Sequence, residues 1–385
     1  MSRLGALRQS SRANLIVAVV AIGLAALVPL FFAPLSAFMN NAVLALAYVV
    51  MALGLNIVVG FAGLLDLGYV AFYAFGSYTV GWLASDFFAY SNGGQGVHIL
   101  APKLLSSPAG IHVNFLLIAM AAIVVCAIVG VLIGLPTLRL RGDYIAIVTL
   151  AFGEIIRVFA FFGDDIHLGK HALLTNGRQA ISPVDQIDLP LLSQFDSAFS
   201  LRPYYWFALA MVALVLFVNF RLRDSRLGRA WIAIREDEVA AASMGVPLVK
   251  TKLLAYATGG ALGGMAGAFL GTYYNSVNAN QFQFGFSIFI LAMVILGGLG
   301  SIWGVVIGAV ALSFINTYLI PSLNDVPDKF GLDFDFTTLS FGIFGFLIVL
   351  MMVLRPEGLL PERRRRLELT EGIGTGEEPL FEVRE

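Results

Sequence analysis

The stretch FLLIAMAAIVVCAIVGVLIGL, residues 115–135, decides the fold of this chain, because its 21 consecutive residues include no charge. A helix of about 20 apolar residues crosses about 30 Å of hydrocarbon and satisfies its own backbone there. Hydrophobic residues make up 58% of the 385 residues and charged residues 13%, against roughly 45–50% and about 25% in soluble domains. Nine more apolar stretches lie at residues 13–33, 39–59, 64–84, 144–162, 204–220, 253–274, 284–300, 303–320 and 338–354. The sequence therefore predicts an all-α integral membrane protein with about ten transmembrane helices.

The second and third apolar stretches leave the number of crossings open. Gly60, Gly63, Gly68 and Gly76 interrupt the apolar run and could produce a broken or re-entrant helix in place of two clean crossings. Asp66 lies in the same segment. At a helix break near the cytoplasmic surface, its burial would be slight.

The basic residues predict the orientation of the bundle. With the N-terminus inside, 18 of the 24 lysines and arginines fall in cytoplasmic segments, five fall outside, and Arg157 lies within a stretch. We therefore expect a transmembrane domain over residues 13–354 between two cytoplasmic ends, residues 1–12 and 355–385. Residues 163–203 then form an outer loop. The first apolar run is too long for a cleavable signal peptide.

No motif of a common enzyme class occurs in the chain. GxSxG, HExxH and CxxC are absent, and a thiolate metal site is excluded because Cys126 is the single cysteine. The nearest match to a P-loop, GDDIHLGKH at residues 163–171, has five residues between its glycines where four are needed, and His171 replaces the magnesium-binding Ser or Thr. It also lies on the outer side. Energy for active transport must therefore come from a partner or from an ion gradient.

The longest cytoplasmic loop, residues 221–252, contains GRAWIAIREDEVAAASMGVPLVKTK. Asp237 and Glu238 precede a run of small residues that ends at Gly245, and this order predicts a short helix with acidic residues at its start and a glycine stop. A compact helix with a small-residue face can enter a cleft on a partner. A solvated, charge-rich connection is the alternative.

A charged pair is predicted inside the stretch at residues 144–162. Glu154 lies ten residues from Tyr144, on the order of 15 Å into the membrane, and Arg157 follows three residues later on the same face. Because a charge at that depth is costly unless paired or hydrated, the two side chains either satisfy each other or line a wet path. A buried pair that only orients helices is the alternative.

Glycines recur every four residues in the stretch at residues 253–274, at Gly259, Gly263, Gly267 and Gly271. This spacing lets another helix approach closely, so helix packing is the expected role. The GGLGS turn at residues 297–301 is expected to serve packing as well.

Five longer motifs carry a family resemblance that runs in order over nearly the whole chain. They are GLNIVVGFAGLLDLGYVAFYAFGSY at residues 54–78, LPTLRLRGDYIAIVTLAFGEIIRV at 135–158, LGRAWIAIREDEVAAASMG at 227–245, VILGGLGSIWG at 294–304 and LRPEGLLP at 354–361. Together they resemble the LivM-type permeases of bacterial branched-chain amino-acid ABC importers. The resemblance implies a type II-like importer permease in the inner membrane. Its implied partners are a second, LivH-type permease, two ATPase subunits that bind ATP and magnesium, and a periplasmic binding protein.

The resemblance also implies roles for particular residues. The loop segment that matches the ATPase-docking region of the family supplies the coupling candidates Arg235, Glu236, Asp237, Glu238, Ala241 and Gly245. Its spacing departs from the general ABC permease pattern, because Glu238 precedes Gly245 by seven residues and not six. The whole segment is therefore assigned to coupling. Asp66, Glu154 and Arg157 are candidates for the translocation pathway.

The outer loop departs from the family where it is expected to face the binding protein. Relatives commonly have LTGG followed two residues later by Gly-Ile, whereas this chain reads LTNGRQAI at residues 174–181. The docking candidates are Thr175, Asn176, Gly177 and Arg178.

The family gives leucine, isoleucine and valine as the first expectation for the substrate, with urea, short amides and other amino acids as alternatives. An ion-coupled secondary transporter, with Glu154 or Asp66 titrating, is an alternative of another class, and a membrane scaffold without transport is a third. Neither a nucleic acid partner nor a cofactor bound by this chain is expected. The arginines at 363–366 are expected to contact anionic lipid headgroups at the end of the last helix.

Overall fold

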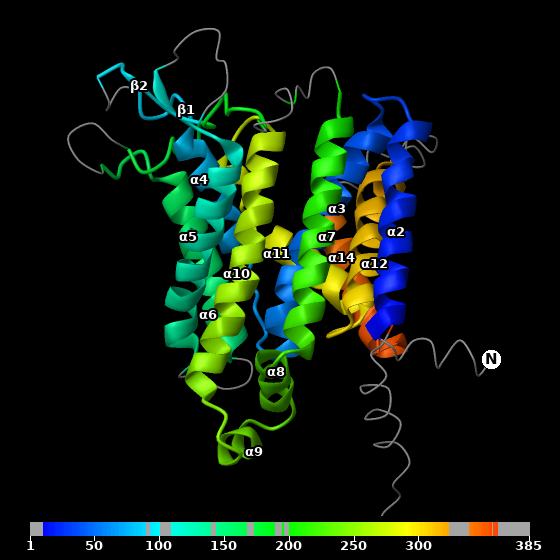
Figure 1. Ribbon diagram of the computed structural model, residues 1–385. Helices are drawn as coiled ribbons and strands as arrows, with labels where there is room; N and C mark the ends of the chain where they lie inside the picture. The colour runs from blue at the N-terminus through cyan, green and yellow to red at the C-terminus, as the bar shows by residue number, and fades with distance from the viewer. Residues whose placement is uncertain are drawn as a thin grey trace, which may run out of the picture.

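The computed structural model is a helical bundle with a small sheet at one end and two short helices at the other (Figure 1). It describes residues 11–89, 93–100, 109–138, 140, 144–167, 173–188, 195, 200–322, 339–355 and 357–360. Of the two ends predicted at residues 1–12 and 355–385, residues 1–10 and 361–385, with the arginines at 363–366, lie outside this part of the chain.

Each of the ten predicted apolar stretches coincides with a helix. These helices are α2 (Ser11–Phe31), α3 (Ala37–Leu55), α4 (Val70–Leu83), α5 (Phe115–Thr137), α6 (Tyr144–Phe161), α7 (Arg202–Asp224), α10 (Leu248–Tyr273), α11 (Phe284–Gly297), α12 (Ile302–Phe314) and α14 (Ser340–Leu354). Among the described residues, seven helical segments are long and apolar enough to cross a membrane, and shorter apolar helices lie at Ile16–Phe31 and Gly342–Leu354. The prediction of a helical, multi-pass membrane protein is confirmed.

The segment around Gly60 forms a broken helix. α3 continues into the π-helix η1 (Asn56–Phe61), the chain then leaves helical geometry, and α4 begins only at Val70 and has 14 residues. Gly68 lets α6 pack closely against this segment, because a Cβ there would lie 2.0 Å from the carbonyl oxygen of Thr149 on α6. Of the two alternatives left open by the sequence, the structure has the broken helix, and α4 is shorter than the stretch at residues 64–84.

Helix α10 packs against α5, α4 and α3 and occupies the centre of the bundle. Its glycines bring backbones close together: a Cβ on Gly267 would lie 2.5 Å from the Tyr73 oxygen on α4, and a Cβ on Gly259 would lie 2.9 Å from the Gly54 oxygen on α3. Ser77 also donates a hydrogen bond to the Gly267 oxygen at 2.9 Å. The predicted packing role of these glycines is confirmed.

A three-stranded sheet departs from the all-helical prediction. β1 (Ala84–Ser85) pairs antiparallel with β3 (Gly110–Val113), and β3 pairs parallel with β2 (Gly96–Ile99). Strands of two to four residues are too short to produce a periodic hydrophobic pattern, so the sequence does not signal them. The sheet lies at the end of the bundle opposite α8 and α9 (Figure 1).

Candidate functional site

The loop at residues 221–252 folds into two helices, α8 (Arg226–Glu236) and α9 (Glu238–Ser243), between α7 and α10. Asp237 caps α9, because its Oδ1 accepts hydrogen bonds from the backbone N–H groups of Val239 and Ala240 at 2.8 and 2.9 Å. Gly245 follows α9 with a φ of +85°, a conformation that glycine adopts without steric cost. The predicted capped helix with its glycine stop is therefore present.

Three contacts fix α8 and α9 to the transmembrane helices. The indole of Trp231 is fully buried and donates to the Thr251 oxygen on α10 at 2.7 Å. Lys252, also buried on α10, forms an ion pair with Glu238 on α9 at 2.7 Å. The guanidinium of Arg235 on α8 donates to the backbone oxygen of Gly60 in η1. The loop is thus a rigid attachment to α10 and to the end of α3, and this geometry argues against a solvated connection.

The outward surface of α9 includes Ala240, Ala242 and Ser243 of the expected small-residue run, together with two larger apolar side chains. Val239 is 73% exposed and Met244 is 85% exposed, whereas Ala241 is buried against its own chain. Ala241 is therefore placed to support α9 from behind and does not face a partner. Sequence reasoning missed Val239, on the first turn of α9, and Met244, the residue that follows the helix.

Glu154 and Arg157 meet on α6. Arg157 Nε donates to Glu154 Oε2 at 2.7 Å, and the Arg157 and Glu154 side chains are 38% and 34% exposed respectively. Exposed apolar neighbours on the same helix include Ile155 and Val158. The pair therefore lies on an outward, mostly apolar face of this chain, where lipid or another subunit would contact it.

Asp66 lies apart from that pair. It is 1% exposed in the segment between η1 and α4, and its Oδ1 accepts from the Gly68 N–H at 2.8 Å. The adjacent Leu67 N–H donates to Thr149 on the buried face of α6, whereas Glu154 lies on the outward face. The expectation of slight burial at the helix break is wrong, because α6 packs directly over this turn.

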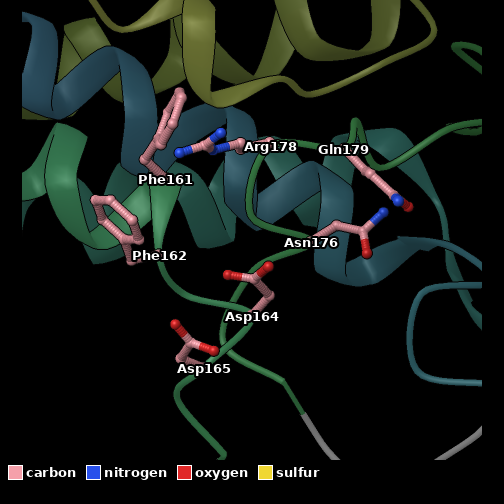
Figure 2. A pocket seen from close by; sticks show the side chains of 7 residues that line it. All are labelled: Phe161, Phe162, Asp164, Asp165, Asn176, Arg178 and Gln179. Atoms are coloured by element: carbon pink, nitrogen blue, oxygen red, sulfur yellow. The ribbon is translucent and has the colours of Figure 1, made fainter.

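The loop that follows α6 forms an open pocket of about 460 Å³ at the end of that helix (Figure 2). Its lining residues are Phe161, Phe162, Asp164, Asp165, Asn176, Arg178 and Gln179. The Arg178 guanidinium carbon lies 5.0 Å from the centre of the Phe161 ring, a cation–π distance. The pocket therefore presents two carboxylates, one guanidinium and two amides on the surface opposite α9.

Only two of the four predicted docking residues line this pocket. Asn176 and Arg178 do, whereas Thr175 and Gly177 are buried and shape the turn beneath them. Thr175 Oγ1 donates to the Ala160 oxygen at 2.9 Å and accepts from the Gly177 N–H at 3.2 Å. Gly177 has a φ of +59°, and a Cβ there would lie 2.5 Å from the Asp164 carboxylate.

One family of known proteins matches most of the chain. Residues 37–354 match the family described as the permease component of the branched-chain amino acid transport system. No solved structure matches the chain.

Curated relatives extend this match to named permeases. The high-affinity branched-chain amino acid permease LivM of Salmonella typhimurium is 36% identical over 359 residues, which cover 88% of this chain and 73% of that protein. A probable LivM of Methanocaldococcus jannaschii is 26% identical over 82% of this chain and 91% of its own. LivH of Escherichia coli K12 is 26% identical over 83% of this chain and 93% of its own. The chain therefore belongs to the branched-chain amino acid transport permease family and is a permease of the LivM type.

Proposed function

We propose that this permease is one of two different transmembrane subunits of an ATP-driven importer for leucine, isoleucine and valine. A LivH-type permease is the second transmembrane subunit, two ATPase subunits bind at the cytoplasmic face, and a periplasmic protein delivers the substrate. Both termini are cytoplasmic in this arrangement. The similarity of the chain to both LivM and LivH proteins supports a pair of related permeases.

The observation that carries this proposal is the attachment of α9. A short helix with exposed Val239 and Met244 projects from the end of the bundle, an ion pair holds it to α10, and the buried indole of Trp231 holds the preceding helix α8 to α10. Exposed apolar side chains on a rigid helix suit insertion into a cleft of a partner. A movement of that partner would then be transmitted through α10 to the helices that pack on it.

Two other surfaces have roles in the same proposal. The outward face of α6 with Glu154 and Arg157 lies toward the LivH-type subunit, so that the charged pair borders the pathway between the two permeases. The pocket with Asn176 and Arg178 receives the binding protein. Its mixed charges suit polar side chains at the rim of a transient interface.

Reconstitution of the complete importer in proteoliposomes tests the proposal. Radiolabelled leucine should be taken up only when both permeases, the ATPase subunits, the binding protein and ATP are present. Excess isoleucine or valine should compete, and urea or acetamide should not. Uptake by this chain alone, driven by a proton or sodium gradient, would instead establish the ion-coupled alternative.

A further inference from the structure

The end of α3 offers a backbone acceptor to the cytoplasmic loop. η1 closes with wide hydrogen bonds, from Ala62 N to the Ile57 oxygen at 3.1 Å and from Leu64 N to the Val58 oxygen at 3.0 Å. The final carbonyls of a helix have no partner within it. The Gly60 oxygen is one of these, and it accepts from Arg235 Nη1 at 2.5 Å, across 175 positions of sequence.

The aliphatic part of Arg235 is held as closely as its charged end. Gly63 has a φ of +70°, and a Cβ there would lie 2.5 Å from Arg235 Cγ and 3.1 Å from its Cβ. The stem of the arginine therefore lies directly on the glycine backbone. This contact leaves Arg235 facing the membrane domain and not a docked ATPase.

The same π-helix is tied to a second turn on its other side. Asn56 Oδ1 accepts from the Gly300 N–H at 2.9 Å, and Asn56 is fully buried. Gly300 belongs to the turn between α11 and α12, and a Cβ on Gly60 would lie 2.6 Å from the Gly300 nitrogen. η1 thus joins α8 on one side to the α11–α12 turn on the other.

We propose that Arg235 is a positioning residue that transmits displacement of α8 and α9 to η1 and, through Asn56, to the turn between α11 and α12. The proposal rests on the proposed function, because α9 must be moved by an ATPase. π-Helical turns occur at functional sites, and a shift of η1 toward α-helical hydrogen bonding would move the end of α3 relative to its neighbours. Displacement of α9 would then reach the transmembrane helices by two routes, one through α10 and one through α3.

Arg235→Ala in the reconstituted importer tests this link. The variant removes the donor to Gly60 but leaves Val239 and Met244 on α9 unchanged. We expect the ATPase subunits to stay bound and to hydrolyse ATP, while leucine imported per ATP falls by about ten-fold, within the roughly 5–150-fold range of allosteric couplings. Arg235→Lys, which keeps a cationic donor, should restore part of this ratio.

Arg229→Ala is the matched control. Arg229 lies on the same helix, is exposed, and donates to the Asp224 oxygen within the loop itself. This variant removes one positive charge from α8 without breaking a contact to η1. Its import per ATP should equal that of the unmodified importer.

Asn56→Ala tests the second half of the route and provides an independent variant if Arg235→Ala does not insert. If the two residues act in series, leucine imported per ATP by the double variant should equal that of the single variant with the larger defect. Multiplication of the two defects would show independent roles and overturn the proposal. An unchanged ratio in Arg235→Ala would overturn it too, as would loss of the ATPase subunits, which would make Arg235 a docking residue. Failure of the unmodified importer to take up leucine would refute the proposed function instead.

Discussion

Removing one member of the Glu154–Arg157 pair should reveal what surrounds the outward face of α6. Arg157 Nε lies 2.7 Å from Glu154 Oε2, so Glu154→Gln or Arg157→Met each leaves one charge without its partner. The double variant removes both charges. A double-mutant cycle therefore isolates the interaction between the two side chains.

The magnitude of this interaction depends on the medium. In water, a helical pair at this spacing contributes about 0.3–0.5 kcal/mol. A single charge at the centre of a membrane helix costs about 2.5–3.5 kcal/mol on insertion scales, and breaking a buried pair costs about 3–5 kcal/mol. Because the two side chains remain 34% and 38% exposed on this chain, we expect an interaction of about 2–3 kcal/mol when lipid or the second permease covers them.

The free energy of unfolding in lipid bicelles is measured for the unmodified permease, the two single variants and the double variant. Leucine uptake by the complete importer with each of these four proteins gives the corresponding effect on function. The singles should be less stable than the double variant. An interaction energy near 0.4 kcal/mol would place the pair in a water-filled path. It would refute the argument that lipid or the second permease covers the two side chains. Strictly additive effects would show that the observed hydrogen bond contributes nothing.

Further predictions concern the exposed side chains of α9, the glycine that follows this helix, the carboxyl group of Asp185 and the hydrolysis of ATP. Val239→Ser or Met244→Ser should each weaken ATPase binding about ten-fold in a pull-down titration, since burying such a side chain contributes about 1.5–3 kcal/mol, and unchanged binding of both would place the contact elsewhere. Gly245→Val should uncouple ATP hydrolysis from import because of its φ of +85°, whereas Gly245→Asn, which tolerates that conformation, should not. Burial raises the pKa of Asp185 above 3.8, although His112 hydrogen bonds to its carboxyl group at 2.7 Å. The folded state therefore binds the proton of the Asp185 carboxyl group more tightly than the unfolded state does. The stability that this difference contributes is fully present below pH 3.8 and is lost as the pH rises through the raised pKa. Asp185→Asn should remove that component from a plot of Tm against pH, and an unchanged plot would contradict it. The purified chain without partners should hydrolyse no ATP, and turnover by a pure sample would contradict the absence of a P-loop.

The loop that follows α6 shows how far a sequence motif can specify a site. The segment with Thr175, Asn176, Gly177 and Arg178 does form a defined turn at a pocket. The motif alone does not separate the two buried residues that build the turn from the two that line the pocket. That separation depends on Asp164 and Phe161, which α6 brings beneath the loop.

The sequence by itself determined the helical membrane class, the approximate position of each apolar helix and the family. These properties are local, because hydrocarbon requires a continuous apolar helix wherever the chain crosses it. Only the tertiary structure decided that Ala241 faces inward, that α6 buries Asp66, and that Arg235 reaches Gly60. Each of these depends on which helix packs beside which, since a side chain finds its partner across the bundle and hydropathy carries no information on that pairing.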